Sequence, residues 1–201
     1  MTSPSSSAGY LQNVAVTTVI TTLFAVMWGL NGSFALPGTI RILCICIVLL
    51  ITALLLGVAF NFTRIARDLP KTTTQTGHPF RSRLYNFAVI AQFVAIFLAA
   101  RQLTAIGHPD AIISAVAIIV GLHFFALIPV FDSWRFAAVG GAMILLGLAS
   151  LLLAPVITRA ATGETVALRT ATVGLGCAII LWAGVAPLVL ATWQQLRHAT
   201  R

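Results

Sequence analysis

The sequence is poor in charged residues. Twelve Lys and Arg and four Asp and Glu stand among 201 residues, whereas a soluble globular domain carries about 25% charged residues. So few charges cannot cover the surface of a protein of this size, and 59% of the residues are hydrophobic. The composition therefore excludes a water-soluble domain, a disordered chain, a coiled coil and a disulfide-stapled secreted protein, and requires lipid around most of the surface.

The sequence also lacks the motifs of common enzyme and metal sites. It contains no HExxH, no Gly-rich phosphate loop, no Ser-x-x-Lys, and no two histidines in one apolar run that could hold haem or zinc. Cys44, Cys46 and Cys177 each lie inside an apolar run and match neither a zinc pattern nor a disulfide framework. We therefore expect no cofactor and no metal, and the sequence disfavours an enzyme.

Six apolar runs are long enough to cross a bilayer, which needs about 20 residues in helical form for a hydrocarbon core of about 30 Å. We therefore predict an all-α polytopic membrane protein with six transmembrane helices in one domain, flanked by a disordered tail over 1–13 and a basic tail over 193–201. The predicted spans are 14–36, 42–62, 84–106, 111–131, 136–157 and 170–192.

The few acidic residues fall between the spans. Asp110 and Asp132 are expected to cap the helices that follow them, because a carboxylate can accept hydrogen bonds from the free amides of a first helical turn. Arg101, near the end of its span, either extends its side chain to the interface or pairs with Asp110 or Glu164.

The distribution of basic residues predicts the orientation. With six spans both termini lie on one side, and that side holds eight of the twelve basic residues; the other side holds Arg41, Arg101, Arg159 and Arg169. The positive-inside rule then places both termini in the cytoplasm, in a membrane that the sequence does not identify. This rule also accounts for the net charge of +8 without nucleic acid.

Five of the eight basic residues lie in the connection from 63 to 83. Their plain role is to fix the topology, and the alternative is a docking site for anionic lipid. These residues are Arg64, Arg67, Lys71, Arg81 and Arg83.

The first and fourth spans share a pattern. Gly29-Leu30-Asn31 aligns with Gly121-Leu122-His123, and Phe34-Ala35-Leu36 aligns with Phe125-Ala126-Leu127. This alignment predicts two three-helix halves, and since three is odd the second half would be inverted relative to the first. The alternative is a chance match between apolar sequences drawn from few residue types.

Polar residues inside the spans are the candidate site residues, because an unpartnered polar group in hydrocarbon costs several kcal/mol. His123 lies midway along its span and could handle a proton or contact a ligand; its structural role would be one hydrogen bond between helices. Asn31 lies among Gly29, Gly32 and Pro37, where the helix could unwind toward a substrate or simply end at the interface. Gln92 lies beside a row formed by Ala91, Ala95 and Ala99.

Thr18 and Thr22 share one face of the first span with Ala25, Gly29 and Gly32. This stripe either lines a narrow polar pathway or allows close helix packing, of which packing is the commoner use.

Two functions remain open. Intramembrane His123 and Asn31, together with the repeat, favour a channel or small secondary transporter for an unidentified solute or ion. The glycine and alanine rows favour a non-transporting subunit or scaffold that packs against a second copy or another membrane protein.

Overall fold

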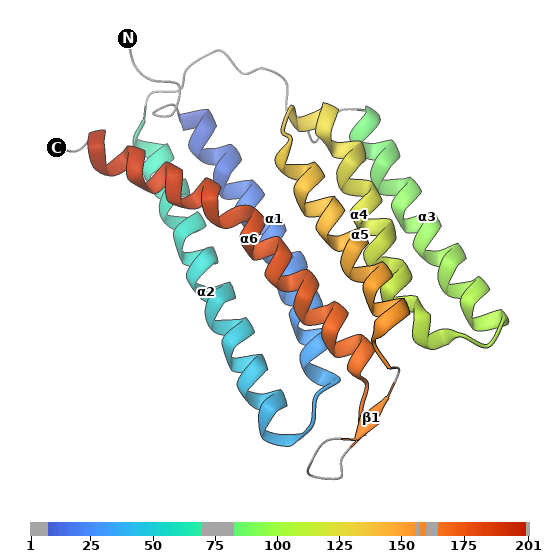
Figure 1. Cartoon of the computed structure of the whole chain (residues 1–201). Helices are drawn as coiled ribbons and strands as arrows, with labels where there is room; N and C mark the ends of the chain where they lie inside the picture. Colours follow the sequence, from blue (N-terminus) through green and yellow to red (C-terminus); the bar gives the residue numbers. More distant parts are fainter. Residues whose placement is uncertain (1–7, 70–82, 156, 160–164, 200–201) are drawn as a thin grey trace.

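Six long α-helices make up nearly all of the described part of the chain (Figure 1). The computed structural model describes residues 8–69, 83–155, 157–159 and 165–199. The helices are α1 (Ala8–Phe34), α2 (Gly38–Asp68), α3 (Arg83–Ala105), α4 (Ile112–Phe131), α5 (Arg135–Leu153) and α6 (Leu168–Ala199). The 3₁₀ turn η3 (Pro109–Ala111) precedes α4, and β1 (Thr158–Arg159) pairs antiparallel with β2 (Thr165–Val166) before α6. The predicted helical fold class is confirmed, and all six helices are long and apolar enough to cross a membrane.

Several helices extend beyond their predicted ends. α1 begins at Ala8, so residues 8–13 belong to the helix and not to the predicted disordered tail. The reason is packing, because Leu11 is fully buried. At the other end of the chain α6 continues to Ala199, through most of the predicted basic tail. There Trp193 lies with its ring centroid 6.2 Å from that of Phe62 on α2, which is itself longer than predicted.

Neither aspartate caps a helix as predicted. Ala111 precedes α4 and Trp134 precedes α5, and in both cases no side chain accepts a capping hydrogen bond. Asp132 instead ends α4 in the left-handed backbone conformation, with φ of 46°. Asp110 lies in η3 and forms an ion pair described below.

The helices pack as two groups of three. α1 packs against α2 and α6, and α4 packs against α3 and α5; the groups meet where α6 contacts α5 and, to a lesser extent, α4. These groups are not the two halves of the sequence. The last helix, α6, packs with α1 and α2, and α3 packs with α4 and α5. We call the end of the bundle at which α1 begins and α6 ends the terminal end, and the opposite end the far end. α5 and α6 lie close together at the far end and diverge toward the terminal end (Figure 1).

The hydrophobic core joins the two groups where α5 and α6 lie close together, and not where they diverge. The largest buried cluster joins four helices, with Trp28 from α1, Ala117 from α4, Met143 from α5 and Val173 from α6. A second cluster, nearer the terminal end, contains buried residues of α1, α2 and α6 alone, among them Phe62. The two groups therefore share a solid core in one half of the bundle and not in the other.

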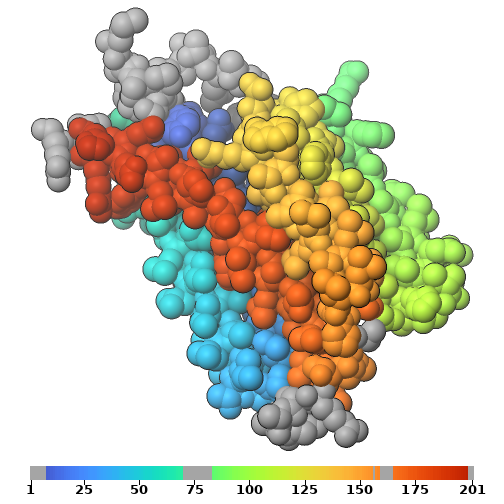
Figure 2. Space-filling view, viewed as in Figure 1, coloured from blue at the N-terminus to red at the C-terminus, as the bar shows by residue number. Residues whose placement is uncertain are grey.

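Glycines bring the helix backbones together. A Cβ atom on Gly174 of α6 would lie 2.5 Å from the Cα atom of Gly32 of α1, and one on Gly140 of α5 would lie 2.5 Å from the carbonyl oxygen of Gly121 of α4. Leu146 of α5 packs over Gly176 of α6, and the side chains of the first half of α6 meet those of α5 (Figure 2). Close packing of small residues is a common way for apolar helices to associate in lipid.

The stripe on α1 is a packing surface. Thr18, Thr22, Ala25, Gly29 and Gly32 are all buried, which favours helix packing over a polar pathway. The alanine row of α3 behaves differently, since Ala91 is exposed and Ala95 and Ala99 are half-buried.

Candidate binding cavity

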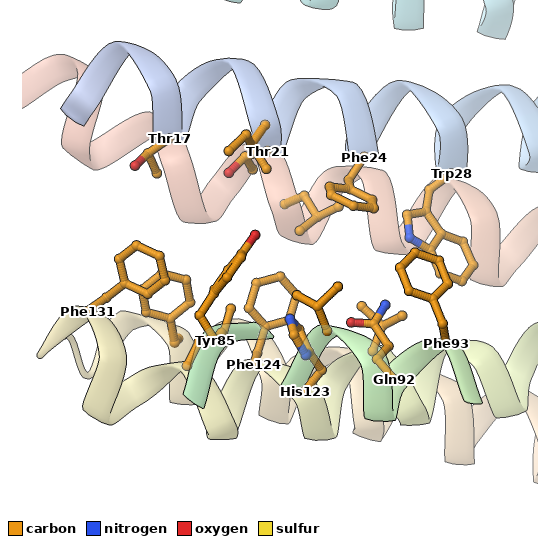
Figure 3. A pocket seen from close by; sticks show the side chains of 16 residues that line it. Thr17, Thr21, Phe24, Trp28, Tyr85, Gln92, Phe93, His123, Phe124 and Phe131 are labelled. Atoms are coloured by element: carbon orange, nitrogen blue, oxygen red, sulfur yellow. The ribbon is translucent and has the colours of Figure 1, made fainter. Parts of the chain in front are cut away.

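A cavity of about 150 Å³ lies between the two helix groups, with α1 on one side and α3 and α4 on the other (Figure 3). We call it the central cavity. Its polar lining residues are Thr17, Thr21, Tyr85, Gln92 and His123. Its aromatic carbon lining comes from Phe24, Trp28, Phe93, Phe124, Phe131 and Phe136. None of its lining residues is Asp, Glu, Lys or Arg.

The central cavity is at mid-height in the bundle. Thr21 lies near the middle of α1, Gln92 near the middle of α3 and His123 near the middle of α4. A rise of 1.5 Å per residue places each of them roughly 15 Å from either end of a span of about 20 residues. Two predicted site residues, His123 and Gln92, thus lie together in the lining of the central cavity, between the two helix groups.

His123 is held in one tautomer. Its Nδ1 atom lies 3.2 Å from the carbonyl oxygen of Ala88 on α3. A carbonyl oxygen can only accept, so in the neutral ring Nδ1 carries the proton and donates it. Nε2 is then a hydrogen-bond acceptor on a ring that lines the cavity. The predicted interhelical hydrogen bond of His123 exists, and it leaves one ring nitrogen for a ligand.

The threonines that line the cavity are not the predicted Thr18 and Thr22 but the residues that directly precede them. Thr18 is fully buried and its hydroxyl donates to the carbonyl oxygen of Val14, at 2.8 Å. Thr22 is also fully buried, with no partner for its hydroxyl among the described residues. Thr17 and Thr21 line the cavity instead. Successive residues are rotated by about 100° around an α-helix, so Thr17 and Thr21 face a different direction from Thr18 and Thr22. The sequence contains both pairs and does not by itself show which pair faces the cavity.

Asn31 lies outside the cavity. It is exposed on α1 toward the far end, and α1 remains helical past Gly29 and Gly32 to Phe34. Unwinding at these glycines, one of the two alternatives for this segment, does not occur in α1, and Gly29 and Gly32 instead allow close packing against Val48 and Gly174.

A row of ring contacts forms one wall of the cavity. Tyr85 and Phe131 have ring centroids 6.4 Å apart, Phe131 and Phe136 are 5.1 Å apart, and Phe136 and Phe124 are 5.9 Å apart. The Phe124 ring continues to the His123 ring at 6.3 Å. The row links α3, α4 and α5, and sequence reasoning missed it, since phenylalanine is expected anywhere on a lipid-facing helix.

The central cavity continues toward the terminal end. A second cavity of about 190 Å³, which we call the vestibule, shares Thr17, Thr21 and Phe124 with it. The vestibule reaches Ser133 and the exposed Arg135 at the turn between α4 and α5.

The central cavity also reaches the side of the bundle. Among the described residues α1 and α3 have no extensive packing contact, and each contributes an aromatic side chain to both the cavity lining and the outer surface. Phe24 of α1 is 45% exposed and Phe93 of α3 is 63% exposed. We call this opening the α1/α3 seam.

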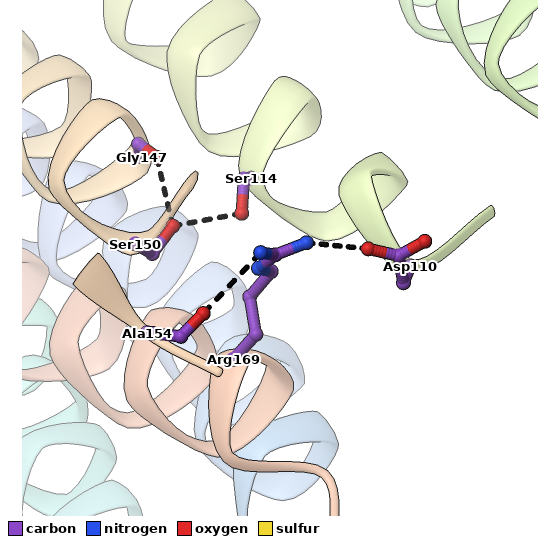
Figure 4. Close-up of polar contacts among 6 residues, drawn as sticks. All are labelled: Asp110, Ser114, Gly147, Ser150, Ala154 and Arg169. Atoms are coloured by element: carbon purple, nitrogen blue, oxygen red, sulfur yellow. Dashed lines mark hydrogen bonds and ion pairs between the residues drawn. The ribbon is translucent and has the colours of Figure 1, made fainter. Parts of the chain in front are cut away.

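Polar contacts tie the helices together at the far end (Figure 4). Arg169 of α6 forms an ion pair with Asp110 of η3 and donates to the carbonyl oxygen of Ala154, at 3.2 Å. Nearby, the hydroxyls of Ser114 on α4 and Ser150 on α5 lie 2.7 Å apart, both buried. These contacts join the beginning of α4, the end of α5 and the beginning of α6.

Of the two alternatives for Arg101, pairing with Asp110 does not occur. Arg169, and not Arg101, pairs with Asp110, while Arg101 is exposed on α3. Glu164 lies outside the described residues. No pattern in the sequence distinguishes the two arginines, because the pairing depends on α6 crossing beside η3.

The basic connection is described in part. Arg64 and Arg67 at the end of α2 and Arg83 at the start of α3 are exposed at the terminal end. The Arg64 guanidinium lies 5.8 Å from the ring centroid of Phe60. Lys71 and Arg81 lie outside the described residues.

Comparison with known proteins identifies no relative: no family model, no curated protein and no solved structure matches the chain. Within the described ranges, no group of three His, Cys, Asp or Glu side chains could hold a metal ion.

Proposed function

We propose that the protein is a small secondary transporter for an uncharged solute, and that the central cavity is its binding site. The observation that carries the proposal is the asymmetry of the space between the helix groups. The cavity lies at mid-height, continues through the vestibule to Arg135 at the terminal end, and meets a packed core and the Arg169 contacts toward the far end.

This arrangement favours a carrier over an open channel. A channel needs a continuous path, whereas a carrier needs a central site open to one side at a time. Ser114 and Ser150 belong to the same helix group, so among the described residues the polar contacts that join the two groups at the far end are the ion pair of Arg169 with Asp110 and the hydrogen bond of Arg169 to Ala154. Contacts of this kind can break and re-form as the two helix groups rock against each other.

The proposed inverted repeat has support in the packing. Under the alignment of Gly29 with Gly121, α1 corresponds to α4 and α2 to α5. Gly29 packs against Val48 of α2, and Gly121 packs against Gly140 of α5. Each pair takes its third helix from the other half of the sequence, α6 for the first and α3 for the second. An exchange of third helices between two inverted units would produce this grouping.

In the membrane we place the terminal end in the cytoplasm, following the positive-inside rule. Exposed Arg64, Arg67 and Arg83 then lie at the cytoplasmic surface, where anionic lipid headgroups would attract them by about 1 kcal/mol per charge. The vestibule opens to the same side.

The scaffold alternative has less to support it. The glycine rows that motivated it are occupied by contacts within the chain. The alanine row of α3, with exposed Ala91, is open to an outside partner, but an exposed apolar face is ordinary for a helix that meets lipid.

Cysteine accessibility tests the carrier without knowledge of its substrate. In a cysteine-free variant reconstituted in vesicles, Thr21→Cys should react with a membrane-impermeant methanethiosulfonate from the terminal side, and more slowly from the far side. Leu146→Cys with Gly176→Cys, on α5 and α6 where the two helix groups meet, should form a disulfide that abolishes only the far-side reaction. Reaction from the terminal side alone, with or without the disulfide, would mean a static pocket. Equal reaction from both sides despite the disulfide would mean a channel.

A further inference from the structure

The lining of the central cavity restricts the charge of its ligand. None of the lining residues is Asp, Glu, Lys or Arg. An ion inside an apolar bundle needs a partner of opposite charge, because the low dielectric raises the cost of an isolated charge. Arg135 is the charged residue among those that line the two cavities; it is exposed and belongs to the vestibule lining. The ligand of the central cavity is therefore neutral.

The walls restrict its shape. Rings of Phe24, Trp28, Phe93 and Phe124 enclose the space from α1, α3 and α4 (Figure 3). Aromatic side chains pack best against other flat rings, edge to face or offset. A volume of about 150 Å³ matches a single six-membered ring, since apolar cavities of about this size in other proteins take up benzene. A single aromatic ring fits both the size and the surface.

The polar groups require a donor on that ring. Nδ1 of His123 is committed to the carbonyl oxygen of Ala88, so the neutral imidazole offers the acceptor Nε2. Gln92 lies beside it on α3, and neither Gln92 nor Thr21 hydrogen-bonds another described residue. In contrast, the hydroxyls of Thr52 and Thr192 outside the cavity donate to the carbonyl four residues earlier. The cavity thus presents unused hydrogen-bonding groups on opposite walls.

We propose that the central cavity binds a neutral hydroxylated aromatic ring, a phenol or hydroquinone, whose O–H donates to Nε2 of His123 while the ring packs among Phe24, Trp28 and Phe93. This inference rests on the proposed function in one respect: both take the central cavity as the binding site. The ring enters through the α1/α3 seam, where Phe24 and Phe93 are exposed. It comes either from a free phenol dissolved in the bilayer or from the head of a long-chain lipid whose tail stays in the seam.

Direct binding tests the proposal on the full chain in lipid nanodiscs, with empty nanodiscs as the blank. The probes are 4-fluorophenol and the near-isosteric 4-fluorotoluene, followed by fluorine NMR. In the wild type 4-fluorophenol should bind saturably and about tenfold more tightly, the effect of one buried hydrogen bond. His123→Phe keeps an aromatic ring at this position but removes the acceptor nitrogen, so the two probes should bind with about equal affinity. His108→Phe, at an exposed histidine outside the cavity, should leave it unchanged.

A second variant guards against misfolding of His123→Phe. Gln92→Leu should lower 4-fluorophenol affinity severalfold without changing that of 4-fluorotoluene. Absence of saturable 4-fluorophenol binding to the wild type, equal affinity for the two probes, or a preference that survives in His123→Phe would overturn the proposal.

Competition separates the two sources of the ring. Displacement of 4-fluorophenol by 4-decylphenol would place a lipid tail in the α1/α3 seam, and competition by short phenols alone would identify a free phenol as the ligand. The carrier proposal is judged apart from this. Phenol binding without alternating accessibility of Thr21→Cys would reject the carrier and retain the site, whereas the reverse result would reject only the ligand class.

Discussion

Arg169 illustrates how one charged side chain is accommodated in an apolar bundle. It is only 12% exposed, and its guanidinium reaches both the Asp110 carboxylate and the Ala154 carbonyl oxygen. A planar guanidinium with five N–H groups can serve two acceptors at once, which a lysine ammonium on a flexible stem does less well. The side chain thereby connects η3, the end of α5 and the start of α6.

Removal of its carboxylate partner should destabilise the protein. In Asp110→Ala the Arg169 charge stays largely buried without a counter-charge, so we expect a loss of about 1–3 kcal/mol and a melting temperature in detergent lower by several degrees. Arg101→Ala, at an exposed arginine on α3, is the matched control and should melt like the wild type. Equal melting temperatures for the two variants would contradict a stabilising role for the ion pair.

At the scale of the helices, association depends on the absence of side chains at a few positions. The backbones of α1 and α6 approach each other at Gly32 and Gly174, and those of α4 and α5 at Gly121 and Gly140. Gly57 in α2 makes no such contact, because no atom lies within 4 Å of where its Cβ would be. Glycine is thus required at some helical positions and incidental at another.

A pair of single-methyl substitutions tests this difference. Gly174→Ala puts its Cβ 2.5 Å from Gly32, which forces α1 and α6 apart and should cost about 1–3 kcal/mol. Gly57→Ala should leave stability unchanged or raise it by about 0.5–1 kcal/mol, because alanine is the better helix former. Thermal unfolding in detergent would measure both. A Gly174→Ala protein as stable as Gly57→Ala would be inconsistent with close contact between α1 and α6.

At the scale of the whole molecule, α1 begins and α6 ends at the same end of the bundle, and the two helix groups are packed together toward the other end. Tyr10 of α1 and Thr192 of α6 have hydroxyl oxygens 3.4 Å apart at the terminal end. The vestibule opens at this end, beside the helix ends that carry Arg64, Arg67 and Arg83. The orientation of the bundle therefore decides which compartment the vestibule faces.

Labelling in intact cells tests the proposed orientation. In a cysteine-free variant, Thr74→Cys in the basic connection should react with an impermeant maleimide only after the membrane is permeabilised. His108→Cys, exposed between α3 and η3 at the far end, should react in intact cells. The opposite pattern would reverse the orientation and place the vestibule outside.

The sequence by itself determined that the chain forms six apolar helices and that His123 and Gln92 are the polar groups to examine. Both follow from local physics: a run of about 20 apolar residues must satisfy its own backbone hydrogen bonds as a helix, and a polar group within it is costly. Only the tertiary structure decided which face of α1 meets the cavity, Thr17 and Thr21 in place of Thr18 and Thr22. It also placed Asn31 on the surface, paired Arg169 with Asp110, and exchanged α3 with α6 between the helix groups. These outcomes depend on the rotation and crossing of whole helices, which are set by contacts between residues far apart in the chain, and an apolar composition is compatible with many such arrangements.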